Sequence, residues 1–240
     1  VGTDTFSGGL HILDISNPVS PSLIGSFAED GYTHDAQIIS YGGPDSQHAG
    51  KEVALCFNEN SVAIVDVTDP TDPILLSNTG YSAAAYTHKG WLAEDQRYLL
   101  VNDESDEGSI NTRTFIFDCA DLDNPVLIGT HIGSTPAIDH NLYNHEGFCY
   151  QANYTAGLRI LDLANVANGQ LTEVAHFDVS PASNAASFAG AWTAYPFFAS
   201  GNIAVSNIND GLYILKANLA SAPPTPPSDL NAEPLRTWLK

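Results

Sequence analysis

Basic residues and cysteines are scarce in this chain of 240 residues. It has 8 Lys and Arg against 28 Asp and Glu, which gives a formal net charge of −20. Such a chain is repelled by nucleic-acid phosphates and by anionic lipid surfaces, so neither is expected as a partner. The three cysteines are too few for a disulfide scaffold. We expect three buried free thiols, with a pair to a segment outside this sequence as the alternative.

Long apolar runs, helical periodicity and catalytic signatures are also missing. No run of about 18 apolar residues is present, so this segment is not expected to insert into a membrane. The chain has no GxSxG, HExxH or P-loop motif and no GxGxxG motif after a strand. These absences argue against the common serine hydrolases, zinc proteases and nucleotide-binding enzymes.

What the chain does contain is one motif repeated five times. Each copy has an alternating apolar run, an aspartate, a turn rich in Asn, Asp and Pro, and a second apolar run. The copies span Gly9–Phe27, Ser61–Gly80, Arg113–Gly133, Gly157–Phe177 and, shortened, Gly211–Leu219. Their aspartates, replaced by Lys216 in the last copy, recur every 44 to 54 residues. A period of this length indicates an array of similar structural units.

Two more apolar runs precede each copy from the second onward. They cover residues 35–40 and 52–57, 91–93 and 97–102, 141–144 and 147–152, and 193–198 and 202–207. Four strands per repeat predict an all-β fold, a β-propeller of four-stranded antiparallel blades. A β-sandwich or a parallel solenoid is the alternative. The repeat position occupied by Leu13, Val65, Phe117, Leu161 and Leu215 is expected to be buried between blades.

The first copy supplies only the last two strands of a unit, and the fifth unit only three. We therefore expect residues 1–219 to begin within a blade and to form about four to five blades of a propeller with about six or seven. The remaining blades of the same parent protein would then be a partner of this segment. Residues 220–240 are rich in proline and predict an extended linker toward a C-terminal anchor or module.

Several strings resemble known repeats. ILDISNP and AIVDVTDP resemble the LVIVD repeat, and the longer strings DGYTHDAQ (Asp30–Gln37), YTHKGWLAEDQRYLLVNDE (Tyr86–Glu104) and YQANYTAGLRILDL (Tyr150–Leu163) resemble the bacterial "choice-of-anchor B" family. The resemblance extends from Thr3 to about Leu219. It implies an exported propeller, extracellular, at the cell surface or periplasmic, with further N-terminal repeats and a C-terminal anchor that varies between members. It implies no catalytic residue.

One column of the repeat carries chemically versatile side chains. It consists of His34, His88, His140 and Trp192, at steps of 52 to 54 residues. The first strand of each propeller blade faces the central channel, so we expect these side chains to converge there as a ligand-binding surface. The three imidazoles, with Asp35 and Asp139 beside them, have the donors of a transition-metal site. In the alternative, each imidazole bonds a carbonyl of the next blade and packs the channel mouth.

Two further groups are carboxylates. Asp14, Asp66, Asp118 and Asp162 each precede a turn and are expected to accept backbone N–H groups there. The loop at residues 102–111 carries Asp103, Glu104, Asp106 and Glu107. These have the oxygen ligands that Ca²⁺ requires, although the spacing is not that of an EF-hand. A solvated acidic hairpin tip is the alternative.

Together these features predict a non-catalytic module, exported or displayed on a bacterial cell surface. It would bind a protein or glycan through its rim and channel mouth. The alternative is a metal-dependent enzyme with His34, His88 and His140 lining the channel. No cofactor is certain from the residues; Ca²⁺ and a transition metal are the two that they suggest.

Overall fold

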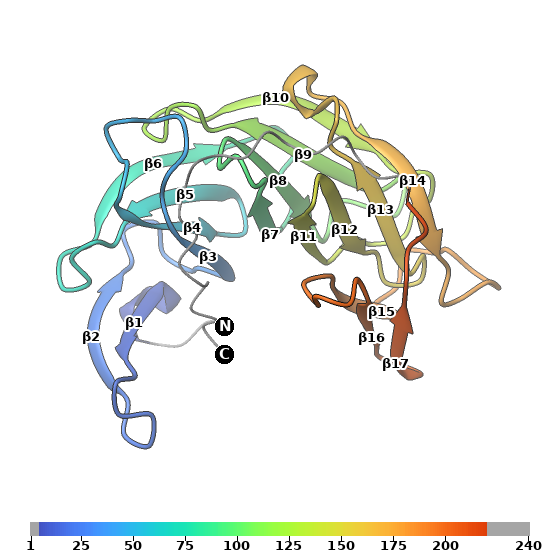
Figure 1. Ribbon diagram of the computed structural model, residues 1–240, viewed down its shortest axis with the longest axis horizontal. Coiled ribbons are helices and arrows are strands. Elements are labelled where there is room, and N and C mark those ends of the chain that lie inside the picture. Colours follow the sequence, from blue (N-terminus) through green and yellow to red (C-terminus); the bar gives the residue numbers. More distant parts are fainter. Residues whose placement is uncertain (1–4, 220–240) are drawn as a thin grey trace.

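A computed structural model describes residues 5–219, which form five antiparallel sheets arranged side by side in an arc (Figure 1). The sheets are β1 (Leu10–Asp14) and β2 (Ser22–Phe27); β3 (Asp35–Ser40), β4 (Glu52–Phe57), β5 (Ser61–Asp66) and β6 (Ile74–Gly80); β7 (Thr87–Leu92), β8 (Tyr98–Asp103), β9 (Arg113–Asp118) and β10 (Val126–Ile132); β11 (Asn141–His145), β12 (Phe148–Ala152), β13 (Leu158–Asp162) and β14 (Thr172–Phe177); and β15 (Ala191–Tyr195), β16 (Ile203–Asn207) and β17 (Gly211–Leu215). Helix is limited, within this range, to the 3₁₀ turns η1 (Phe6–Gly8) and η2 (Val166–Asn168). No helix in the described range is long and apolar enough to cross a membrane.

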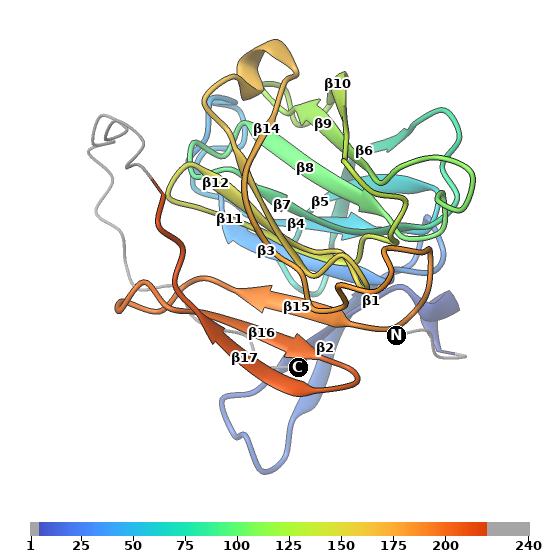
Figure 2. The same cartoon turned by 90° about the vertical axis from the view of Figure 1, so that its right-hand side faces the viewer.

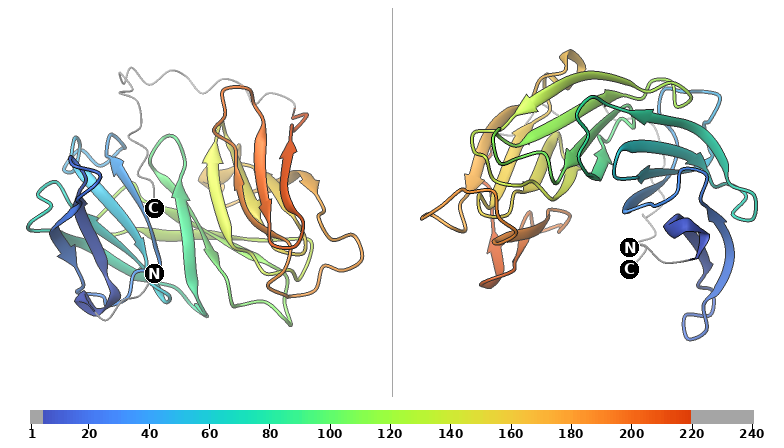
Figure 3. Two further views of the ribbon diagram at one scale, coloured as in Figure 1. Left: turned by 90° about the horizontal axis from the view of Figure 1, so that it is seen from below. Right: turned by 180° about the vertical axis from the view of Figure 1, so that it is seen from behind.

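Each sheet is one blade, built from strands that follow one another in the chain. The first strand of each four-stranded blade lies on the inside of the arc and the last on the outside (Figures 1 and 3). The two-stranded blade β1–β2 stands at one end of the arc and the three-stranded blade β15–β17 at the other (Figures 1 and 3). The side view looks onto the β15–β17 end, with β1–β2 behind it (Figure 2). The predicted all-β fold of four-stranded antiparallel blades is confirmed.

Two of the inner strands, β7 and β15, begin earlier than the apolar pattern predicts. Strand β7 spans Thr87–Leu92 instead of residues 91–93, and β15 spans Ala191–Tyr195 instead of 193–198. The additional residues are Thr87–Gly90 in β7 and Ala191 and Trp192 in β15, and they do not form an alternating apolar run. A strand that begins with such residues lacks the alternating apolar run by which strands are recognised in a sequence.

Apolar layers between neighbouring blades form the core. Val65, Phe117 and Leu161, in the repeat column expected to be buried, are at most 1 % exposed and belong to these layers. The residues one position earlier, Ile64, Ile116 and Ile160, are as deeply buried in the layer on the other side of the same blade. Each third strand therefore faces the preceding blade with one side chain and the following blade with the next.

The two ends of the arc depart from this pattern. Leu13 is 46 % exposed and Leu215 only partly buried, so the expectation of burial was wrong for Leu13 and too strong for Leu215. The position of Leu13 faces the preceding blade, and no described sheet covers that side of β1–β2. Ile214, whose position faces the following blade, is 58 % exposed at the opposite end.

Close contacts at the outer strands lock successive blades together. A bulge near Gly129 in β10 brings its backbone against the turn after β13, where a Cβ on Gly129 would lie 2.2 Å from the carbonyl oxygen of Gly169. At the equivalent bulge of β6, the Ser77 hydroxyl donates a hydrogen bond of 2.7 Å to the carbonyl of Leu122 in the next blade. Blades thus meet through backbone as well as through apolar side chains.

The aspartates of the repeat cap their turns as predicted. An Oδ1 of Asp14, Asp66, Asp118 and Asp162 accepts the backbone N–H two residues later, at 2.7–3.0 Å. Asp118 in addition receives two hydrogen bonds from the Arg97 guanidinium. These aspartates are structural. The three cysteines, Cys56, Cys119 and Cys149, are buried and unpaired.

Candidate functional site: a histidine ladder with a carboxylate

The four residues of the predicted column come together on the inside of the arc. His88 and Trp192 lie within β7 and β15, whereas His34 and His140 immediately precede β3 and β11. The ring centroids are 4.3 Å apart for His34 and His88, 4.2 Å for His88 and His140, and 4.2 Å for His140 and Trp192. We call this continuous row of rings the histidine ladder.

The ladder is buried in its centre and accessible at its ends. His88 and His140 are each 3 % exposed, whereas Trp192 is 47 % exposed and His34 is half-buried. At the His34 end the hydroxyls of Tyr32 and Tyr86 lie 2.9 and 2.8 Å from Nδ1 of the imidazole. Aromatic rings therefore flank the ladder where it meets solvent.

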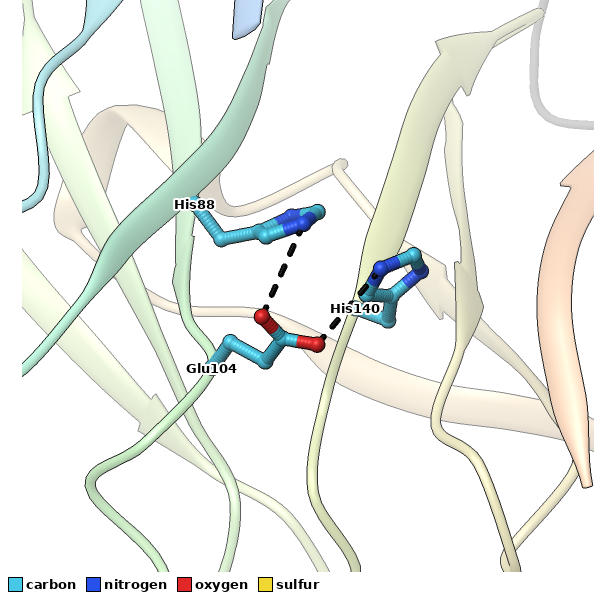
Figure 4. A group of neighbouring side chains, drawn as sticks. All are labelled: His88, Glu104 and His140. Carbon is cyan, nitrogen blue, oxygen red and sulfur yellow. Dashed lines mark ion pairs between the residues drawn. The ribbon is translucent and has the colours of Figure 1, made fainter. Parts of the chain in front are cut away.

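Glu104 connects the two buried imidazoles. Its Oε2 lies 3.7 Å from Nε2 of His88 and its Oε1 3.5 Å from Nε2 of His140, so the carboxylate faces both rings (Figure 4). The Tyr154 hydroxyl holds the carboxylate in place by donating a hydrogen bond of 2.6 Å to Oε1. One ligand atom from each of His88, Glu104 and His140 lies within 4.8 Å of the other two.

The environment keeps both imidazoles neutral. Burial lowers the pKa of His88 to about 2, helped by the neighbouring imidazoles, and burial lowers the pKa of His140 to about 4. The Glu104 pKa is raised, again mainly by burial. Neutral imidazole nitrogens next to a carboxylate form a donor set for a divalent transition metal such as Zn²⁺.

The His140 ring is oriented in the manner of a metal-ligating imidazole. Its Nδ1 lies 2.7 Å from the backbone carbonyl of Trp192 in the next blade and 2.8 Å from the side-chain amide nitrogen of Asn141, which donates to the same carbonyl. Because a carbonyl only accepts, the tautomer with its proton on Nδ1 donates to it. This contact with a carbonyl of the next blade is the one expected if the imidazoles of the column serve to pack the channel mouth. In that tautomer the lone pair of Nε2 is directed at Glu104. Metal-bound histidines commonly donate their second N–H to a carbonyl in this way.

The structure changes the ligand set suggested by the sequence. Asp35 pairs with the buried Lys89 at 3.0 Å, and Asp139 belongs to the acidic cluster around Glu107 rather than to the ladder. His34 is in the ladder but outside the group of ligand atoms within 4.8 Å. Glu104 takes the place of the two aspartates. The sequence could have indicated Glu104. The strand that contains His88 and the strand that ends at Asp103, just before Glu104, are consecutive strands of one antiparallel blade, so Glu104 is expected near His88.

The four carboxylates of the acidic loop at residues 102–111 have different partners, and the loop is not a solvated hairpin tip. The Asp103 carboxylate accepts hydrogen bonds from the Tyr81 hydroxyl and from two backbone N–H groups, and Glu104 serves the ladder. Asp106 and Glu107 turn inward, where burial is the main reason that their pKa values rise to about 6 and about 7. The four carboxylates predicted to share one Ca²⁺ ion therefore do not converge on one point.

Comparisons with known proteins agree with the repeats and the fold. Residues 5–29 and 55–79 match the LVIVD repeat, and both segments contain the motif identified above. Solved structures are similar in fold over 86–88% of the chain. The chain is a β-propeller.

Three solved structures illustrate the likeness, one of them a β-propeller domain by name. The periplasmic gluconolactonase PpgL of Pseudomonas aeruginosa superposes with a TM-score of 0.60 at 15% identity, over 86% of this chain and 58% of its own. A protein from Lactobacillus plantarum gives 0.65 at 13% identity, over 87% and 63%. The β-propeller domain of Swd1 from Myceliophteria thermophila gives 0.56 at 14% identity, over 88% and 65%. The chain thus spans less than two thirds of each of these structures, and identities this low show the fold alone. No curated protein sequence matches the chain.

Proposed function

We propose that this chain is a non-catalytic binding module whose inner face holds one divalent transition-metal ion on His88, Glu104 and His140. A protein or glycan partner would bind beside the ion. The observation that carries the proposal is the placement of two neutral imidazoles against one carboxylate, with three ligand atoms within 4.8 Å of one another. Three protein ligands leave further coordination positions of such an ion available to a bound partner.

Side chains around the ladder suit the contact with that partner. Trp192 is 47 % exposed, Phe188 is 63 % exposed, and the Tyr86 ring lies 5.1 Å from His34. Aromatic rings with one accessible face are the side chains that dominate recognition surfaces. The position on the inner strands also agrees with the tendency of ligand sites to gather where several elements converge.

The cellular setting is part of the proposal. The strings shared with the choice-of-anchor B family support an exported protein at the bacterial cell surface or in the periplasm, and the net charge of −20 suits an exposed, soluble surface. The apolar faces at Leu13 and Ile214, buried at the same repeat positions elsewhere, support further blades that close the ring. The proline-rich linker expected at residues 220–240 lies outside the described residues.

Metal titration tests the first half of the proposal. We expect the chain, stripped with EDTA, to bind one Zn²⁺ or Co²⁺ ion per molecule by isothermal titration calorimetry. Both His88→Ala and Glu104→Gln should weaken that affinity by about 100-fold or more, since each removes a direct ligand. His176→Ala, a replacement at an exposed histidine of β14, is the matched control and should bind like wild type. Unchanged affinity in Glu104→Gln would refute the site.

Partner binding tests the second half. The zinc-loaded chain should retain glycans or surface-protein fragments in an array experiment, and Trp192→Ala should reduce retention about 10-fold or more without changing zinc affinity, as loss of a central aromatic contact does. Binding that is the same in Trp192→Ala and in His88→Ala as in wild type would place the partner elsewhere.

A metal-dependent hydrolase is the second candidate, favoured by the same open coordination positions. One structural neighbour is a gluconolactonase, so lactones are a sensible first substrate class. Turnover by the zinc- or manganese-loaded chain that disappears in Glu104→Gln and persists in Trp192→Ala would favour the enzyme over the binding module.

A further inference from the structure

A second group of carboxylates lies between the β8–β9 loop and the segment that leads into β11. Its members are Asp103, Asp106, Glu107 and Asp139. Asp103 and Asp139 are 0% exposed, and the Asp106 side chain is 2% exposed. The backbone N–H of Asp139 donates a hydrogen bond of 3.0 Å to Oε1 of Glu107, which ties the loop of one blade to the start of the next.

Within residues 5–219, four oxygens of this group are buried without a hydrogen-bond partner. They are both carboxylate oxygens of Asp139, Oδ1 of Asp106 and Oε2 of Glu107. Asp103, by contrast, is fully used by Tyr81 and by backbone N–H groups. Buried polar atoms in folded proteins nearly always have a partner, because leaving one unpaired costs the whole desolvation of the group. Four such oxygens on three neighbouring acidic side chains favour a cation as their common partner.

The charges in the group are also unbalanced. In the part of the chain that the structure describes, the one cationic side chain bonded to it is Arg113, whose Nε and Nη2 lie 2.7 and 2.6 Å from the same oxygen of Asp106. Arg113 therefore leaves the second oxygen of Asp106 unpaired and does not bond Glu107 or Asp139 within the described residues. Carboxylates taken out of water need a counter-charge, and charged groups are otherwise rarely buried.

We propose that Asp106, Glu107 and Asp139 bind one Ca²⁺ ion that fastens the β8–β9 loop to the following blade. Ca²⁺ takes about six to eight oxygen ligands at about 2.3–2.6 Å in flexible geometry, and carboxylates on a loop supply them readily. The group offers oxygen and no nitrogen or sulfur, which favours Ca²⁺ over the transition metals suited to the histidine ladder. Water and backbone carbonyls complete the shell. The site is distinct from the ladder in both ligands and metal.

Binding of Ca²⁺ should draw the loop inward. Among the described residues, ligand atoms of the His88 group lie within 4.8 Å of one another, whereas these three carboxylates do not form such a group. An ion that binds all three brings Asp106 and Glu107 toward the buried Asp139. Binding of Ca²⁺ should therefore raise the free energy of unfolding, because a ligand that binds only the folded state stabilises that state by mass action.

Thermal unfolding and calorimetry of the full chain, stripped with EDTA, test the proposal. At pH 7.5, CaCl₂ at about 100 times its Kd should raise the melting temperature by about 5–10 °C. Asp139→Asn keeps the shape and removes the charge; it should abolish this shift and weaken Ca²⁺ binding by about 100-fold or more, with Glu107→Gln as a second variant. The control Asp72→Asn replaces an exposed aspartate and should respond to Ca²⁺ like wild type.

A proton shared between the carboxylates is the competing explanation, and the same experiment decides it. In that case Ca²⁺ leaves the wild-type melting temperature unchanged, and Asp139→Asn is stabilised equally with and without the ion. Either result overturns the calcium site. The histidine ladder serves as an internal reference: Zn²⁺ binding should survive Asp139→Asn, and the Ca²⁺ response should survive His88→Ala.

Discussion

Leu161→Ala and Leu13→Ala remove the same atoms from the same repeat position of two different blades. Leu161 is 1 % exposed and packs between β7–β10 and β11–β14, in a layer with Leu142 and Cys149. Truncating a leucine in such a layer removes its transfer free energy and leaves a cavity, a loss of about 2–5 kcal/mol. Leu13 is 46 % exposed. With about half of the burial and no closed cavity, its truncation should cost only about 1 kcal/mol.

Urea denaturation and thermal unfolding measure the difference. A loss of about 3 kcal/mol in a chain of this size should lower the melting temperature by about 6–12 °C for Leu161→Ala, against about 2–4 °C for Leu13→Ala. In a longer protein in which another blade covers β1–β2, the cost of Leu13→Ala should rise to that of Leu161→Ala. Equal costs in the present chain, within about 0.5 kcal/mol, would refute the assignment of the column to the contacts between blades.

Two further predictions concern the contacts that hold the blades and turns. Gly129→Ala should lower the free energy of unfolding by about 1–3 kcal/mol, because the added Cβ would meet the carbonyl of Gly169. In Gly133→Ala the nearest neighbour of the added Cβ would be 3.2 Å away, so the loss measured by chemical denaturation should be smaller. Hydrogen bonds from Arg97 lower the pKa of Asp118. A lowered pKa means that the folded chain binds fewer protons than the unfolded chain, so this stabilisation is present above about pH 4 and lost as the pH falls. Asp118→Asn should flatten acid unfolding in that range, and an unchanged profile would contradict the role of the pair.

The repeat architecture could be predicted from the sequence because it depends on interactions between residues that are close together in the chain. Alternating apolar runs specify strands, and the Asp-containing turns end them at fixed places. A constant period makes each unit pack on its neighbour in the same way. The histidine ladder follows from the same logic, since residues at one repeat position occupy equivalent places in successive blades. The repeat predicts that His88 and His140 face the channel from successive blades, and the turn function of Asp118 depends only on its neighbours in the chain.

Tertiary structure alone decided which acidic groups meet which partners. Glu104 and Asp106 are two residues apart, yet Glu104 faces the imidazoles of the inner strands and Asp106 bonds Arg113, because the chain turns just after β8 ends at Asp103. The exposure of Leu13 could not be predicted from the sequence either, because the motif around Leu13 has the same residue pattern as the motif around the buried Leu161. A repeat specifies how a strand is built and which side of it is apolar. Whether another blade covers that side, and where a long carboxylate side chain ends, depends on neighbours distant in the chain and on the register in which strands pair.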